Sequence, residues 1–385
     1  MKKKVLMIAG ETSGEQLGIP LIEACKDSGL DLEIEGLVGL DLQKNGVKSI
    51  HDCRPLEIIG FIDPILSFYK IWRCFQAATN YMKREKPDLV ILIDHASFNL
   101  CVAAHAKKLN IPVLFYVSPQ VWAWRERRVS KIVKLVDHMM VLFPFEVPIY
   151  KNAGLPVTNI SHPLLKSTVA AERADEARKK FSINEDMKVV TLMPGSRNGE
   201  ILRHTPELAK TAKRLALIHP DIVFIAPLAR EEHKVLFEKL WLNAEPELPL
   251  PLICNRMVHT AVRAANAVIV ASGTASLEVA LLERPAVVIY KTNAISYFII
   301  KWLIKIPYIS LPNILLNKEV YPEFIQDNLD SDKVAKYVSS ILVGDGSLQV
   351  GNLKALRELL KGSESSQGAS VVHDLLDRKL RLNNT

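Results

Sequence analysis

A run of small polar residues, Ser272-Gly273-Thr274, interrupts an otherwise apolar stretch in the second half of the chain. Residues 267–270 before it are apolar and largely β-branched, which is typical of a buried parallel strand. Apolar residues at helical spacing follow from Ala275 onward. A helix that starts directly after a strand offers unpaired N–H groups and the positive end of its dipole, and phosphate groups bind there. The predicted nucleotide diphosphate site consists of Ser272, Gly273, Thr274 and Ala275.

Glu278 lies one helical turn after Thr274, which we expect to be the N-cap of this helix. A carboxylate in that position can accept hydrogen bonds from the paired hydroxyls of a sugar. The alternative is that no ligand binds here and that Gly273 only lets the helix pack closely on the strand.

A second turn of this kind contains Arg197. Residues 189–193 read as a buried strand, 194–197 as a turn and 199–219 as a helix. Open α/β sheets bind their ligands at the carboxyl ends of the strands, so Arg197 is placed to hold a diphosphate through two parallel hydrogen bonds. The alternative is a simple ion pair with Glu200.

The first half of the chain starts with the same arrangement. A strand over residues 5–9 runs into Gly10-Glu11-Thr12-Ser13-Gly14 and then into a helix. The glycine spacing differs from that of dinucleotide-binding loops, and no acidic residue ends a second strand about 20 residues later. A nicotinamide cofactor is therefore disfavoured.

Several elements must position these turns. Apolar runs predict further strands, and helical segments separate them, which favours a doubly wound α/β sheet in each half. A chain of 385 residues is long enough for two domains. The expected division is residues 1–165, 166–345 and a set of C-terminal helices over 346–385 that packs on the first domain or on a partner subunit. The additional predicted strands cover residues 33–39, 89–94, 113–117, 138–142, 222–226 and 286–290.

Composition limits the partners and the compartment. The net charge of +7 and the sequence pI of about 9.0 favour an anionic partner. The sequence shows no helix-turn-helix, zinc finger or RNP-type aromatic strand motif, so nucleic acid is disfavoured as the partner. The five cysteines are scattered and form no C-x-x-C pair, and the histidines show no metal-ligand spacing. We expect reduced thiols, no metal, no cofactor, no segment that spans a bilayer, and a cytoplasmic protein.

Two segments fit a lipid surface. Residues 58–73 are apolar on nearly every side and are flanked by cations, as in a helix that lies in a membrane interface. The alternative for this segment is a core or dimer-interface helix. Residues 116–131 contain Trp122 and Arg125 among further cations, which suits acidic head groups or nucleic acid, or else a solvated helix start. The residues expected to touch the membrane are Ile62, Ile65, Leu66 and Phe68.

Two glycine-turn sites in two α/β halves resemble the GT-B glycosyltransferases. Six local sequences occur in the order and spacing of the lipid-A-disaccharide synthase family, and the resemblance covers roughly residues 4 to 330. They are residues 9–14, Tyr116 to Arg125, Phe143-Pro144-Phe145-Glu146, Met193-Pro194-Gly195-Ser196-Arg197, Ala271 to Glu278 and Ser310-Leu311-Pro312-Asn313.

The resemblance implies an inverting enzyme that joins UDP-2,3-diacylglucosamine to 2,3-diacylglucosamine 1-phosphate (lipid X), forming a β-1,6 disaccharide and UDP. It also implies a homodimer, peripheral on the inner membrane of a Gram-negative bacterium. Asp94, at the end of a strand, would be the base, Glu278 would hold the ribose, and Asn313 would lie near the donor. The acceptor-binding residues would be Gly10, Glu11, Ser13, Gly14, Ser118, Trp122 and Arg125.

One departure from the family pattern concerns the base. The family usually reads Ile-Asp-x-Pro-Asp-Phe-Asn, whereas this chain has Ile93-Asp94-His95-Ala96-Ser97-Phe98-Asn99. We take Asp94 as the base and Ser97 as a helix cap. Two alternatives remain: another UDP-GlcNAc-dependent GT-B enzyme, and a non-catalytic, dimeric membrane-binding paralogue.

Overall fold

The computed structural model describes residues 2–10, 12–52, 64–119, 128–292, 307–363 and 365–383. The chain forms two compact units, Met1–Pro163 with Leu360–Thr385, and Leu164–Leu359. Each unit is a parallel β-sheet with helices on both faces, as the alternation of strands and helices predicts.

The first unit has a seven-stranded sheet in the order β3-β2-β1-β4-β5-β6-β7. The chain order reverses direction at β1 and β4, whose paired residues end at Ala9 and Ile93. Ligands of doubly wound sheets bind at such a switch point. The strands are β1 (Lys3–Ala9), β2 (Leu32–Val38), β3 (Lys48–Ser49), β4 (Leu89–Ile93), β5 (Val113–Tyr116), β6 (His138–Val141) and β7 (Val157–Asn159).

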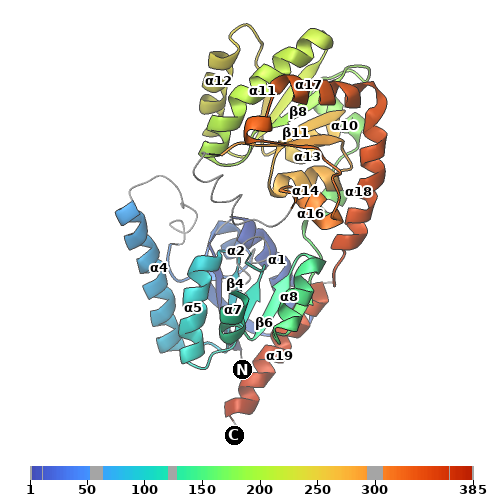
Figure 1. Ribbon diagram of the computed structural model, residues 1–385. Helices are drawn as coiled ribbons and strands as arrows, with labels where there is room; N and C mark the ends of the chain where they lie inside the picture. The colour runs from blue at the N-terminus through green and yellow to red at the C-terminus, as the bar shows by residue number, and fades with distance from the viewer. Residues whose placement is uncertain are drawn as a thin grey trace. The chain divides into compact units, whose positions relative to one another are not determined.

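Helices cover this sheet on both sides (Figure 1). One side buries α1 (Thr12–Asp27), α2 (Leu40–Lys44) and α19 (Ser365–Asn383). The other side buries α4 (Pro64–Glu85), α5 (Ala96–Lys108), α7 (Val129–Leu135) and α8 (Val147–Asn152), the last preceded by the short 3₁₀ helix η2 (Pro144–Glu146). Residues 5–9 of β1 and all residues of β4 are buried whichever way they point, which explains their continuous apolar sequences.

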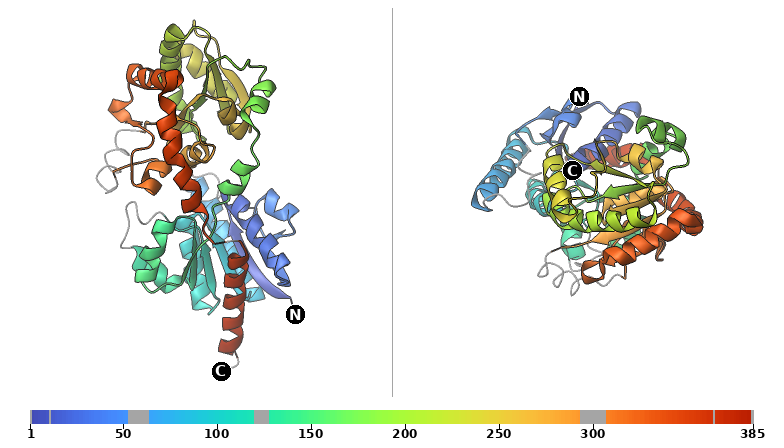
Figure 2. Two further views of the ribbon diagram at one scale, coloured as in Figure 1. Left: turned by 90° about the vertical axis from the view of Figure 1, so that its right-hand side faces the viewer. Right: turned by 90° about the horizontal axis from the view of Figure 1, so that it is seen from above.

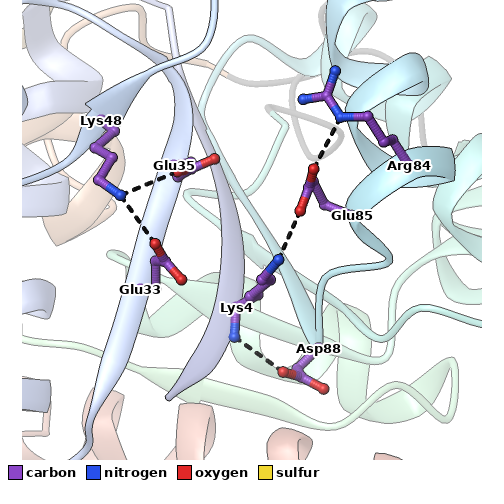
Figure 3. Close-up of polar contacts among 7 residues, drawn as sticks. All are labelled: Lys4, Glu33, Glu35, Lys48, Arg84, Glu85 and Asp88. Atoms are coloured by element: carbon purple, nitrogen blue, oxygen red, sulfur yellow. Dashed lines mark hydrogen bonds and ion pairs between the residues drawn. The ribbon is translucent and has the colours of Figure 1, made fainter. Parts of the chain in front are cut away.

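Ion pairs cross the surface near the start of β1 and β2 (Figure 3). Lys4 Nζ lies 2.6 Å from Glu85 Oε2, and Lys48 Nζ lies 3.0 Å from Glu33 Oε1. These groups are at least partly exposed to solvent, so each pair contributes little stability. Since they lie toward the amino ends of the strands, they are remote from the edge at which Gly10 and Asp94 begin their turns.

The second unit has a six-stranded sheet in the order β10-β9-β8-β11-β12-β13. Its strands are β8 (Val189–Met193), β9 (Val223–Leu228), β10 (Leu252–Asn255), β11 (Ala267–Ala271), β12 (Ala286–Tyr290) and β13 (Glu323–Ile325). One face is covered by α11 (Asn198–Ile218), α12 (His233–Ala244) and α17 (Ser331–Ser340). The other helices of the unit, among its described residues, are α9 (Leu164–Val169), α10 (Ala174–Lys180), α13 (Val258–Ala264), α14 (Thr274–Leu281), α16 (Leu311–Leu316) and α18 (Gly346–Leu360). A π-turn covers Ile341–Asp345 and a 3₁₀ turn covers Gln326–Asn328.

The C-terminal segment 346–385 differs from the expected single set of helices. Helix α18 belongs to the second unit, where Gln349 exchanges hydrogen bonds of 2.8 and 3.2 Å with the backbone of Ala286. Helix α19 belongs to the first unit and lies beside its sheet (Figure 2). Its apolar face, which includes Val372 and Leu375, packs with α1 in one core. Among the described residues, no helix has the length and apolarity to cross a bilayer.

Candidate functional site

The first candidate site lies where β1 and β4 end. Ala9 pairs with Ile93, so Gly10 and Asp94 begin two neighbouring turns. Gly10 is buried, and a Cβ on Gly14 would lie in ordinary contact with Ala9 and Ile93, so the start of α1 packs against both strands. Of the other predicted acceptor residues in this turn, Glu11 lies outside the described residues, and Ser13 lies in the first turn of α1 with its side chain outside them.

The backbone around Asp94 is unusual. Asp94 has φ 55° and His95 has φ 40°, both in the left-handed region that non-glycine residues rarely adopt. The Asn99 amide holds this turn from inside α5, because its Nδ2 donates to Ile93 O at 3.1 Å and to Asp94 O at 2.7 Å. The Asp94 side chain is partly exposed, and its loss of surrounding water raises its pKa.

The prediction that Ser97 caps α5 is wrong. The helix begins at Ala96 with His95 in the N-cap position, and Ser97 is exposed inside the first turn. Both ring nitrogens of His95 are buried without a hydrogen-bond partner among the described residues, and the ring meets Phe98 edge-on.

Ser118 follows the neighbouring strand β5 at the same edge. Asp94 N donates to Tyr116 O at 3.0 Å, which brings the two strand ends together. Ser118 is buried, and its Oγ lies 2.6 Å from the hydroxyl of Tyr150 and donates to Pro119 O at 2.9 Å. Burial raises the pKa of Tyr150 to about 12, so its hydroxyl stays protonated. Trp122 and Arg125 lie outside the described residues.

The second candidate site lies at the carboxyl edge of the other sheet, where β8 ends before Arg197. Gly195 has φ 113°, and a Cβ there would meet Glu200 Oε2, so this turn requires glycine. Glu200 Oε2 accepts from Ser196 N at 2.9 Å and Arg197 N at 3.3 Å. The Arg197 side chain is 81% exposed, and its Nη1 lies 3.5 Å from Glu200 Oε1. The ion pair considered from the sequence is therefore present, and the exposed guanidinium remains accessible to a ligand.

His204 supports the same edge, and sequence reasoning missed it. This fully buried residue on α11 lies with Nδ1 2.7 Å from Pro194 O, while its Nε2 accepts from Lys291 N at 2.9 Å. Because a carbonyl oxygen only accepts, Nδ1 must carry the proton that it donates to Pro194 O. Burial lowers the pKa of the imidazole ring. His204 thereby links the turn after β8 to the segment after β12.

Strand β11 leads into the predicted phosphate-binding turn. The N-cap of α14 is Gly273 and not Thr274, since Thr274 is already the first helical residue. Gly273 has φ 145°, a backbone conformation in which a side chain would be strained. No side chain among the described residues caps this helix start, and Gly273 and Thr274 are exposed. The Ser272 hydroxyl donates to Ile309 O at 2.9 Å.

Glu278 lies one turn into α14 and is partly exposed. Burial raises its pKa to about 7. No described residue donates a hydrogen bond to its carboxylate, so the acceptor capacity of this group is available to a ligand.

Asn313 lies at the start of α16 and is fully buried. Its Oδ1 accepts from Val320 N at 2.8 Å and from Tyr321 N at 2.9 Å, and its Nδ2 donates to Tyr321 O and to Glu323 Oε1. The amide is therefore occupied by the chain itself. Glu323, like His204, is a partner that sequence reasoning did not identify.

Metal ligation has no support in the part of the chain that the structure describes, where no three His, Cys, Asp or Glu side chains gather in a way that would hold an ion. The four described cysteines, Cys25, Cys74, Cys101 and Cys254, are unpaired.

Comparison with known proteins decides the family. A family model for lipid-A-disaccharide synthetase matches residues 5–371. Lipid-A-disaccharide synthase 1 of Legionella pneumophila is 37% identical over 379 residues, which cover 98% of this chain and 97% of that relative. The synthase of Pseudomonas aeruginosa is 36% identical over 377 residues, with 98% and 99% covered.

The chain belongs to the lipid-A-disaccharide synthase family. It is accordingly an enzyme of lipid A disaccharide synthesis and a glycosyltransferase.

Solved structures of distant relatives confirm the GT-B fold class. A Staphylococcus aureus MnaA–UDP structure superimposes with a TM-score of 0.63 at 12% identity and covers 99% of this chain and 98% of that one. Acinetobacter baumannii MurG superimposes with a TM-score of 0.54 at 14% identity, with 98% and 100% covered. At these identities the likeness establishes the fold alone.

Proposed function

We propose that this member of the lipid-A-disaccharide synthase family transfers 2,3-diacylglucosamine from UDP to the 6-hydroxyl of 2,3-diacylglucosamine 1-phosphate. The products are the β-1,6 disaccharide 1-phosphate and UDP. The observation that carries the proposal is the uncapped start of α14 at Gly273, beside the exposed Thr274 and within one turn of Glu278. This group offers N–H donors to a diphosphate and a free carboxylate to a ribose.

We assign the base to Asp94. Its carboxylate would take the proton from the acceptor's 6-hydroxyl while that oxygen forms a bond to the anomeric carbon. The bond from this carbon to the UDP oxygen breaks on the opposite face, so the configuration inverts. The raised pKa of Asp94 supports this role, because a carboxylate with less surrounding water holds a proton more strongly.

The leaving UDP carries negative charge away from the sugar. In the proposed site the N–H groups of Gly273 and Thr274 and the Arg197 guanidinium would stabilise that charge, with Ser272 and Ala275 lining the turn. Glu278 would accept hydrogen bonds from the ribose. Asn313 would act through the turn that it holds, since its amide is already occupied. The acceptor would bind at the other sheet, near Gly10, Gly14 and Ser118.

The altered sequence at residues 94–99 is compatible with activity. The proline and second aspartate that the family usually carries correspond here to Ala96 and Ser97, the first two residues of α5. Proline and acidic residues are favoured at these helix positions for structural reasons. Their loss therefore changes the helix start and leaves Asp94 in place, which argues against the non-catalytic paralogue.

We further propose that the enzyme works as a peripheral protein on the inner membrane and as a homodimer. Tyr69 and Trp72 on α4 are 54% and 44% exposed, with ring centroids 6.1 Å apart, and the neighbouring Lys70 and Arg73 are exposed. Exposed aromatic rings beside cations suit the interface of an anionic bilayer. Of the predicted contacts, Ile62 lies outside the described residues, and Ile65, Leu66 and Phe68 lie on α4 with side chains outside them.

The test is mass spectrometry of the products formed from UDP-2,3-diacylglucosamine and its monosaccharide 1-phosphate. The proposal predicts a species whose mass equals the sum of both substrates minus UDP. Free diacylglucosamine as the only product would indicate a hydrolase. Transfer to a muramyl-lipid acceptor in a competition assay would indicate the alternative UDP-GlcNAc-dependent enzyme.

A further inference from the structure

Glu323, at the start of β13, accepts four hydrogen bonds from a single turn. Its Oε2 accepts from Ile309 N at 2.9 Å. Its Oε1 accepts from Ser310 N at 2.9 Å, from Ser310 Oγ at 2.7 Å and from Asn313 Nδ2 at 2.9 Å. An ionised carboxylate suits such a set because both oxygens are acceptors, whereas an amide of the same size would present one donor to these N–H groups.

The turn held by Glu323 is also bound to the predicted phosphate-binding turn. Ser272 Oγ donates to Ile309 O at 2.9 Å, so the peptide groups of Ile309 are fixed from two sides. The sheet reinforces this link: Ser272 N donates to Ile289 O on β12, and β12 pairs with β13 at Val288 and Glu323. Ser272, which directly follows β11, and Glu323, on β13, thus both form hydrogen bonds with Ile309.

Asn313 completes the arrangement. Its buried amide closes the segment from residue 313 to 321 on itself, through Val320 N, Tyr321 N and Tyr321 O. Glu323 takes the remaining hydrogen of this amide. Ser310 and Asn313 are fully buried. Buried hydrogen bonds therefore hold the 309–313 turn in position.

We propose that Glu323 is a positioning residue for binding the diphosphate of the sugar nucleotide. It holds the 309–313 turn so that Ile309 O orients Ser272, and Ser272 in turn fixes the backbone that enters Gly273. This inference rests on the proposed function, since it assumes that the diphosphate binds at the start of α14. Loss of the carboxylate loosens the Gly273 turn and weakens nucleotide binding, while binding of the acceptor on the other unit is unaffected.

The experiment compares Glu323→Gln with Glu319→Gln in the full chain. Glu319 is an exposed glutamate four residues earlier that makes no side-chain hydrogen bond to a described residue, which makes it a matched control. Calorimetric titration with UDP, well below the melting temperature of each variant, should give binding weakened about tenfold or more for Glu323→Gln and unchanged for Glu319→Gln. The KM for the sugar nucleotide should rise in parallel and the KM for the acceptor should stay constant.

A double-mutant cycle separates positioning from a general loss of stability. Ser272→Ala and Glu323→Gln should be non-additive in UDP binding, because both act through Ile309. Binding by Glu323→Gln within about twofold of the wild type, or simply additive effects in the cycle, would overturn the proposal. If Glu323→Gln does not fold, Ser310→Ala replaces it: removing one of the four donors should weaken UDP binding by about threefold, and an unchanged affinity would overturn the proposal. A wild-type chain that binds no UDP would instead refute the proposed function.

Discussion

Asp94 and Glu278 are carboxylic acids whose pKa values are raised by the same cause, the loss of water around the carboxylate. They differ in what surrounds them. Asp94 lies in a strained turn held by Asn99, and a backbone hydrogen bond from His95 opposes the rise in pKa. No described residue donates in this way to Glu278, and burial raises its pKa to about 7. The surroundings of Asp94 suit a general base. Those of Glu278 suit a carboxylate that accepts hydrogen bonds from a bound ligand.

Glu278 should make binding of a UDP-sugar depend on pH. Ribose hydroxyls that donate to its carboxylate stabilise the ionised form, so binding lowers the pKa from about 7 and becomes stronger as pH rises through that value. We expect the affinity for UDP-N-acetylglucosamine, measured by calorimetry, to increase about tenfold between about pH 6 and pH 8. In Glu278→Gln this dependence should vanish. An equal pH dependence in the variant would exclude Glu278 as the ribose acceptor.

The polar partners at the second site show the limit of sequence reasoning. Ser272, Gly273 and Thr274 were predictable because small residues between two apolar runs are a local signal. Glu323 and His204 give no such signal, since their hydrogen-bond partners are brought to them by the sheet and lie up to 87 positions away. The choice between Gly273 and Thr274 as N-cap also depended on a φ angle that composition does not specify.

At the scale of elements, long buried strands such as β4 and β11 were predicted because every residue in them is apolar and buried. The strands that sequence reasoning missed, β3, β7, β10 and β13, have two to four residues and are partly exposed. Strands β3, β7 and β10 also contain polar residues that are common in loops, and β13 is only three residues long. The periodicity of apolar residues therefore cannot distinguish these short strands from turns.

The apolar segment 58–73, which includes the first residues of α4, should determine membrane association. Replacing Ile62, Ile65, Leu66 and Phe68 with serine lowers the apolarity of this segment and should move the enzyme from the membrane to the soluble fraction of a cell lysate. Replacing Tyr69 and Trp72 with serine should act in the same direction. A matched control exchanges the exposed Leu217 on α11 for serine and should leave the distribution unchanged. An unchanged distribution of the α4 variants would assign this segment to the core or to a subunit interface.

At the scale of the whole molecule, α18 and α19 stabilise different units, so changes in them should be separable. Leu356 on α18 and Leu375 on α19 are both buried, and substitution of either with alanine should cost about 2–5 kcal/mol. The transition that Leu356→Ala lowers in a thermal melt should be the one that UDP raises, because a ligand stabilises the unit that binds it. UDP should not change the melting temperature of the transition that Leu375→Ala lowers. An equal effect of UDP on both would contradict two independently stable units.

The central claim is that Asp94 is the base of the proposed transfer and takes no part in binding UDP. The most direct test measures turnover and UDP affinity on the same preparation of Asp94→Asn. The account predicts a loss of about 10²- to 10⁴-fold in kcat, with the Kd for UDP within about twofold of the wild type. A variant that keeps more than about a tenth of the wild-type rate would contradict the account and place the base elsewhere.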